Sequence, residues 1–147
     1  MATNRTLLVS VSEPTLYVAF ELGARTWTLG MTSGFGVVAW VKGLPAGDWP
    51  GLHRLVARAK VRFGLPAAAP VVSCYEAGRD GFWIHRALVE AGIGNRVVDS
   101  ASIEVNRRQR RAKTDRIDAR KLVQMLVRVC WGGGGRLAGG ARPGRRR

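Results

Sequence analysis

The alternation of short apolar runs with segments of helical periodicity limits the possible folds of this chain more than any other feature. Three runs rich in strand-forming residues come first, separated only by short stretches that contain Gly; they are Thr15–Leu22, Arg25–Thr32 and Val37–Gly43. Strand-like runs joined by such turns typically pair as hairpins. The first part of the chain therefore predicts three consecutive, hairpin-linked strands.

Helical and strand-like segments alternate in the rest of the chain. From Leu52 to Phe63 apolar residues recur at helical spacing, with Pro50 suited to the first turn and Gly64 to the end. The segments that follow are a strand at Ala69–Glu76, a helix at Gly81–Gly92, a strand at Asn95–Ser100 and a helix from about Thr114 to Val129. The order βββαβαβα predicts an α/β fold with a mixed sheet covered by helices, and it matches a ribonuclease-H-like fold.

The chain is predicted to form one domain with an addition at each end. Its 147 residues suffice for one real core but not for two. Residues 1–14 form an N-terminal extension and residues 15–130 form the domain. Residues 131–147 contain seven Gly and five Arg, and such a tail cannot bury enough apolar surface to order itself.

Several features predict a cytoplasmic protein. The two cysteines, Cys74 and Cys130, show neither metal-ligand spacing nor a disulfide framework, which favours a reducing compartment. The early apolar run is interrupted by Glu13 and Pro14, so it reads as neither a signal peptide nor a membrane span. No membrane partner is expected.

Positive charge is concentrated near the C-terminal end. The net charge is +14, but residues 1–104 carry ten Lys and Arg against eight acids, whereas residues 105–147 carry fourteen against two. This distribution is typical of a face or arm that binds nucleic acid. An anionic membrane is the weaker alternative, because the basic run lacks the bulky apolar face that a membrane-surface helix needs.

Within this basic region, the run Arg107–Lys113 has five positive charges in seven residues. We expect it to hold phosphates, with an affinity that falls steeply as salt rises. A generic charged surface is the alternative, and no residue pattern here indicates base reading. The residues predicted to bind nucleic acid are Arg107, Arg108, Arg110, Arg111, Lys113 and Lys121.

Two acids, Asp115 and Asp118, lie inside the same basic segment. On a helix at about 100° per residue, both continue the apolar stripe that contains Leu122 and Leu126. The basic side chains fall on the opposite, outer face: Arg116, Arg120, Lys121 and Arg128. Carboxylates that face a core are costly to bury without a cation. A metal site is therefore favoured, and a solvated ladder of ion pairs is the alternative.

Two further carboxylates, Glu21 and Glu76, end strand-like runs, where mixed sheets place their chemistry. Four carboxylates can hold two Mg²⁺ ions roughly 3.5–4 Å apart for phosphodiester chemistry, with Mn²⁺ as an alternative. The predicted catalytic and metal-binding residues are Glu21, Glu76, Asp115 and Asp118. The competing acids are Asp99, which could replace Glu76 or join the cluster, Asp80 as a helix cap and Glu104 as an ion-pair partner.

Three stretches carry a resemblance to a known family: "LYVAFELG", "VVSCYEAGRDGFWIHRAL" and "GIGNRVVDSASIEVNRRQRRAKTDRIDARKLVQML". Together they resemble the N-terminal domain of the DEDD insertion-sequence transposases, a domain similar to the Holliday-junction resolvase RuvC. The likeness covers about Leu16 to Arg128. It implies an RNase-H-like fold in which four acids bind Mg²⁺, and these roles fall on Glu21, Glu76, Asp115 and Asp118.

The resemblance also implies partners and a larger protein. Members of the family act on DNA, some with a guide RNA from the element itself, and homo-oligomers are expected of the full-length proteins. They carry a second domain with a serine nucleophile, whereas here Gly- and Arg-rich sequence follows Val129. The first acid is usually Asp, and here it is Glu21. We therefore expect an impaired, truncated copy whose tail is translated out of frame.

Two other functions stay open. A non-catalytic fragment that binds nucleic acid, or regulates full-length subunits, would bind in a salt-sensitive way without needing Mg²⁺ or the acids. A structural domain that requires a partner chain is the third possibility.

Overall fold

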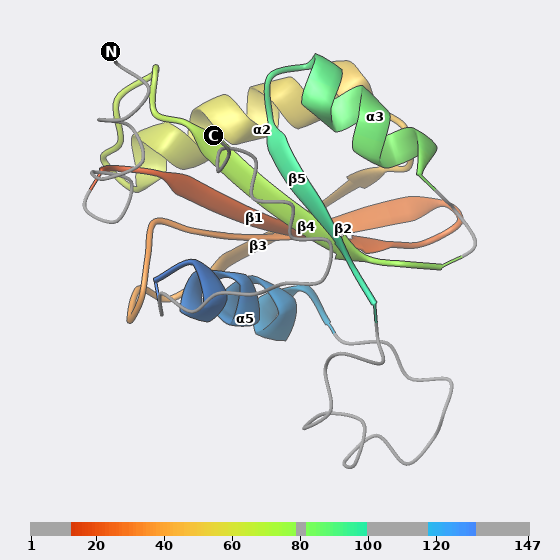
Figure 1. The fold of residues 1–147 in the computed structure, drawn as a ribbon. Coiled ribbons are helices and arrows are strands. Elements are labelled where there is room, and N and C mark those ends of the chain that lie inside the picture. Colours follow the sequence, from red (N-terminus) through yellow and green to blue (C-terminus); the bar gives the residue numbers. More distant parts are fainter. Residues whose placement is uncertain (1–12, 79–81, 100–117, 132–147) are drawn as a thin grey trace, which may run out of the picture.

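A computed structural model of the chain describes residues 13–78, 82–99 and 118–131. Within these ranges the elements follow in the order predicted, βββαβαβα (Figure 1). Their bounds are β1 Leu16–Leu22, β2 Thr26–Thr32, β3 Trp40–Pro45, α2 Trp49–Arg62, β4 Val71–Glu76, α3 Trp83–Glu90, β5 Gly94–Val98 and α5 Ala119–Trp131. Among these described helices, none is long and apolar enough to cross a membrane.

The five strands form one mixed sheet in the order β3-β2-β1-β4-β5. The two hairpin pairs, β1 with β2 and β2 with β3, are antiparallel. The pairs β1 with β4 and β4 with β5 are parallel, and the chain enters β4 and β5 through the helices α2 and α3. This sheet order with helices on both faces is the ribonuclease-H-like arrangement, and the predicted fold class is confirmed.

The sheet separates two apolar layers because successive side chains of a strand point to opposite faces. On β1, Leu16, Val18 and Phe20 belong to the core cluster that includes residues of α2 and α3. Tyr17 and Ala19 belong instead to the cluster formed with α5. Figure 1 shows the same division, with α2 and α3 on one face of the sheet and α5 on the other.

Helix α2 forms as predicted because both of its ends are well specified. At its start the side chain of Asp48 accepts a hydrogen bond from the Gly51 N–H at 3.0 Å, and Pro50 occupies the first turn. At its end Gly64 adopts a φ of +69°, a left-handed conformation that Gly takes most readily.

The third strand lies further along the chain than predicted. It occupies Trp40–Pro45, so Val37 and Val38 belong to the preceding turn. The hydroxyl of Thr32 donates to the carbonyl of Val37 at 2.9 Å, which fixes the backbone of this turn before the strand begins. Strand propensity alone places the start of this strand too early. The side-chain hydrogen bond of Thr32 competes here with the backbone hydrogen bonds that a strand would form.

The prediction that the last helix begins near Thr114 and carries Asp118 on its inner side is wrong. Helix α5 begins at Ala119, and Asp118 is its exposed N-terminal cap. The carboxylate of Asp118 accepts a hydrogen bond from the Lys121 N–H at 2.9 Å. Aspartate is among the preferred residues for this position because it satisfies a backbone N–H that has no partner within the helix. Thr114 itself lies outside the described residues.

Helix α5 also ends later than predicted, at Trp131 rather than Val129. The indole N–H of Trp131 donates to the hydroxyl of Tyr17 at 2.9 Å. This bond ties the last residue of the helix to the start of β1. The rest of the predicted tail, 132–147, and most of the predicted extension, 1–12, lie outside the described residues.

Candidate functional site

Glu21 and Glu76 occupy corresponding positions on neighbouring parallel strands. Phe20 of β1 pairs with Tyr75 of β4, and each glutamate is the next residue along its strand. Neighbouring strands lie about 4.8 Å apart, so the two backbones hold these carboxylates close together. Both glutamates are half-buried.

The two glutamates also share a face of the sheet. By strand alternation Glu21 lies on the side of Tyr17 and Ala19, and Glu76 lies on the side of Cys74. Tyr17, Ala19 and Cys74 all pack in the cluster with α5. Both carboxylates therefore stand on the face that α5 covers.

The start of α5 lies toward the same end of the sheet. The carbonyl of Ala119 comes so close to Gly30 of β2 that a Cβ atom at Gly30 would lie 2.5 Å from its oxygen. Gly30 pairs with Ala19, which precedes Glu21 by two residues, or about 7 Å along the strand. Since α5 runs from Gly30 toward Tyr17, its cap Asp118 lies on the glutamate side of the helix.

Neither glutamate has a neutralising partner in the described ranges. No side-chain hydrogen bond or ion pair joins the carboxylate of Glu21 or Glu76 to another described residue. Half-buried carboxylates side by side repel each other, and a divalent cation between them would remove that repulsion. The donor set of two adjacent carboxylates therefore fits Mg²⁺ or Mn²⁺, which prefer oxygen ligands.

The described residues do not complete a metal site. Among them, no three His, Cys, Asp or Glu side chains come together in a group that could hold an ion. Asp118 is engaged as a helix cap. Asp115 lies outside the described residues, as do the predicted phosphate-binding residues of the run Arg107–Lys113. Exposed Asp99 comes one residue after Val98, which pairs with Glu76.

The outer face of α5 is basic. Ala119, Leu122 and Leu126 are buried against the sheet, as expected from the apolar stripe. The exposed positions of the helix include Arg120, Lys121, Gln124 and Arg128. The predicted separation of inner apolar and outer basic residues is confirmed for this helix, and Lys121 is exposed as a phosphate contact requires.

A second basic cluster surrounds Trp40 on β3 and was not predicted. The Arg62 guanidinium lies 4.7 Å from the centre of the ring, that of Arg58 5.6 Å, and the Lys42 ammonium 5.5 Å. Such cation–π contacts leave the outer side of each charge available to a polyanion. The signal in the sequence is the spacing of Arg54, Arg58 and Arg62 at every fourth position.

The two thiols are poor candidates for chemistry. Cys74 is fully buried on the face covered by α5, and burial raises the pKa of both Cys74 and Cys130, with Arg96 opposing the shift. Thiolate is the nucleophilic and metal-binding form, so both groups are inert near neutral pH.

This burial predicts a loss of stability at alkaline pH. The folded state keeps Cys74 neutral, whereas in the unfolded chain the thiol ionises near its ordinary value of 9.0. The contribution of the thiols to stability should therefore be constant below about pH 9 and fall above it, by up to about 1.4 kcal/mol per pH unit for each thiol. Urea unfolding across this range measures the slope. The slope should be shallower in Cys74→Ala, the remainder arising from Cys130 and Tyr17, and equal slopes would contradict the assignment.

No protein-family model matches the chain. The chain is 39% identical over 115 residues to the protein named "Putative transposase y4rJ" from Sinorhizobium fredii (strain NBRC 101917 / NGR234). The match takes in 76% of this chain and 29% of the relative. The chain is thus a distant homologue of that protein and spans under a third of its length.

Proposed function

We propose that this chain is the nuclease-fold domain of a DEDD insertion-sequence transposase and acts in DNA transposition or recombination. The single observation that carries the proposal is the alignment of Glu21 and Glu76 on adjacent parallel strands, without a partner among the described residues. The homology to a protein named as a transposase supports the same reading. The fold adds support, because it is the one that the DEDD resemblance implies.

The acids would hold Mg²⁺, with Mn²⁺ as the alternative. Glu21 and Glu76 supply two carboxylates from the sheet, and Asp115 and Asp118 are proposed to supply the others from the segment that leads into α5. When bound, divalent ions activate an attacking oxygen and stabilise a leaving oxygen in phosphodiester chemistry. Glu21 stands where the family usually has Asp, and its extra methylene lets the carboxylate reach further from the strand.

The basic residues would position DNA beside these acids. Lys121 is exposed in the first turn of α5, next to the cap, and the run Arg107–Lys113 precedes the helix in sequence. Phosphate contacts of this kind fix the register of a nucleic acid without reading its bases. A guide RNA and a second copy of the chain are further proposed partners, both from the family resemblance.

The experiment that tests the proposal measures binding and cleavage of branched and linear DNA by the full chain, with Mg²⁺ and with EDTA. We expect cleavage or tighter binding only with the metal. In Glu76→Gln the metal-dependent part should fall by about 100-fold, as expected when a charge-stabilising group is lost. A metal effect that is absent in the wild type, or that survives this substitution, contradicts a DEDD site.

A second candidate function is metal-independent binding of nucleic acid, with regulation of full-length subunits as its role. The capping contact of Asp118 favours it, because a carboxylate committed to the Lys121 N–H is a weaker metal ligand. This candidate predicts salt-sensitive binding that is the same in EDTA and Mg²⁺ and is unchanged in Glu76→Gln.

A further inference from the structure

An exposed pair of aromatic rings lies at the end of the molecule where α5 ends. Phe35, in the turn between β2 and β3, stacks on Trp131 with ring centres 6.3 Å apart and an angle of 26° between the planes. Phe35 is 61% exposed and Trp131 is 41% exposed. Two large rings held together at the surface in this way offer a ready face to a third planar group.

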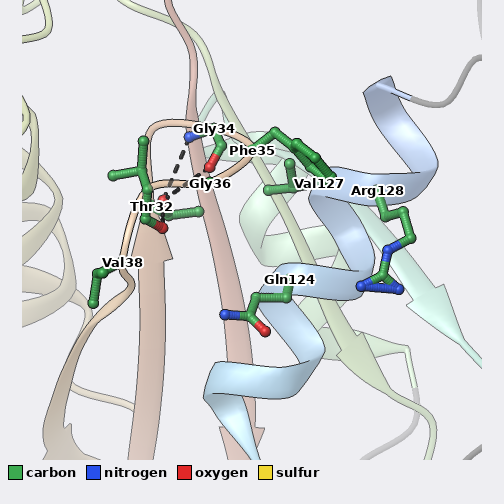
Figure 2. Close-up of a pocket in the computed structure, with 9 residues that line it drawn as sticks. Thr32, Gly34, Phe35, Gly36, Val38, Gln124, Val127 and Arg128 are labelled. Carbon is green, nitrogen blue, oxygen red and sulfur yellow. Dashed lines mark hydrogen bonds between the residues drawn. The ribbon is translucent and has the colours of Figure 1, made fainter.

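The rings are held in place by the structure beneath them. The Trp131 indole is fixed by its bond to Tyr17, and a Cβ atom at Gly34 would lie 3.1 Å from the Trp131 ring. Thr32 braces the turn, because its one hydroxyl proton is shared between the carbonyls of Val37, at 2.9 Å, and Gly34, at 3.3 Å, while its oxygen accepts from the Gly34 N–H (Figure 2). Because these rings are already ordered, the binding of a planar group to them costs little conformational entropy of the protein.

Beside the rings lies a pocket of about 230 Å³ between this turn and α5. Its lining combines apolar groups with two polar ones on α5, Gln124 and Arg128. Figure 2 shows Arg128 next to Val127 near Phe35, and Gln124 on the same helix, nearer its start. An aromatic surface together with an amide and a guanidinium is the combination that proteins use for unpaired nucleobases.

The charge around the pocket selects an acidic polymer over an apolar protein segment. Arg120, Gln124 and Arg128 follow one another at every fourth residue, about 6 Å apart, on the exposed face of α5. Lys121 adds a further charge, and the helix itself contains no acid. The three cations Arg120, Lys121 and Arg128 thus extend along α5 from the end of the sheet that holds Glu21 to the aromatic pair.

We propose that the pocket between the β2–β3 turn and α5 binds an unpaired base of a single-stranded nucleic acid, packed against the ring of Phe35, which Trp131 supports from its other face. Arg128 and Gln124 contact the base edge or its phosphate, and Arg120 and Lys121 hold the preceding phosphates. The inference rests on the proposed function, from which it takes the class of polymer, a nucleic acid. It adds the place where a single strand of that polymer is held. DNA and RNA share this chemistry.

The test measures fluorescence anisotropy of labelled oligonucleotides with the full chain in EDTA at fixed salt. The oligonucleotides are a DNA strand, the RNA strand of the same sequence, and the DNA duplex. Phe35→Leu, which keeps an apolar side chain but removes the ring, should weaken binding of the better single strand by about 5- to 150-fold. Duplex binding should not change, because its bases are already stacked.

Two matched variants serve as controls. Phe35→Tyr keeps the ring and should bind single strands like the wild type. Phe82→Leu removes a ring that is equally exposed, at 59%, but precedes α3 on the other face of the sheet, and it should also leave binding unchanged. Urea unfolding of each variant checks that the turn still folds.

The outcomes separate this inference from the proposed function. If single strands bind equally well to Phe35→Leu and the wild type, the stacking site does not exist, although Mg²⁺-dependent cleavage of DNA could still stand. If the wild type binds the duplex but no single strand, the inference fails alone. If it binds no nucleic acid at all, both fail.

Discussion

Replacement of both Glu21 and Glu76 by Gln is expected to abolish the stabilisation of this protein by Mg²⁺. The divalent ion proposed to lie between the two half-buried carboxylates would bind only the folded state of the wild type. It should therefore add about 2.7 kcal/mol when its concentration is 100 times the dissociation constant. The variant keeps the size of both side chains but has no charge to offer, so its unfolding curve should be the same in Mg²⁺ and in EDTA.

The same variant should be more stable than the wild type when no metal is present. Like charges in neighbouring strand positions destabilise a sheet, and their removal should add about 0.2–1 kcal/mol in EDTA. Urea denaturation in EDTA and across a Mg²⁺ series, at constant ionic strength, measures both effects. Glu90→Gln is the matched control, because Glu90 is an exposed acid at the end of α3. A Mg²⁺ response that persists in the double variant would place the ion elsewhere.

The second large effect is expected at Gly30, where β2 touches α5. Valine favours strands, so Gly30→Val gains in local propensity. Its Cβ would nevertheless lie 2.5 Å from the carbonyl oxygen of Ala119 and 2.9 Å from its carbon, which are backbone atoms that cannot rotate away. The substitution must push the start of α5 off the sheet, and we expect it to lower the free energy of unfolding by about 3 kcal/mol.

Gly43→Val on β3 is the control for this prediction. A Cβ atom at Gly43 meets only the methyl group of Thr26 at 3.5 Å and the Trp27 carbonyl oxygen at 3.6 Å, which are ordinary contacts. The free energies of unfolding of the two variants, measured by thermal or urea denaturation, should differ by most of the loss expected for Gly30→Val. Similar stabilities would mean that α5 does not pack against β2 as closely as described, and the position of Asp118 beside the sheet would then be lost as well.

The order of elements could be predicted because each element carries its own local signal. The runs of β1 and β4 are nearly continuous in apolar residues, as buried parallel strands are, and α2 has Pro50 and Gly64 at its ends. The errors arose where a side chain determined a boundary. The sequence pattern predicts that Asp118 is one of two inward-facing acids, whereas its carboxylate in fact caps α5 by accepting a hydrogen bond from the Lys121 N–H.

The site could be predicted only in part, because its geometry depends on contacts between distant segments. Carboxylates at two strand ends suggested that Glu21 and Glu76 meet, but only the parallel register of β1 and β4 aligns them. The aromatic pair was missed because Trp131 is followed by glycines and reads as part of a tail. Its bond to Tyr17 joins residues 114 positions apart, which no local pattern reveals.

The central claim is that Glu21 and Glu76 hold a divalent ion between β1 and β4. The most direct measurement is the anomalous scattering of Mn²⁺ in crystals of the full chain. The claim predicts a peak within about 2.0–2.6 Å of carboxylate oxygens from both glutamates, the range seen for Mg²⁺ and larger hard cations. Mn²⁺ bound only elsewhere, or no peak at this edge of the sheet, would contradict it.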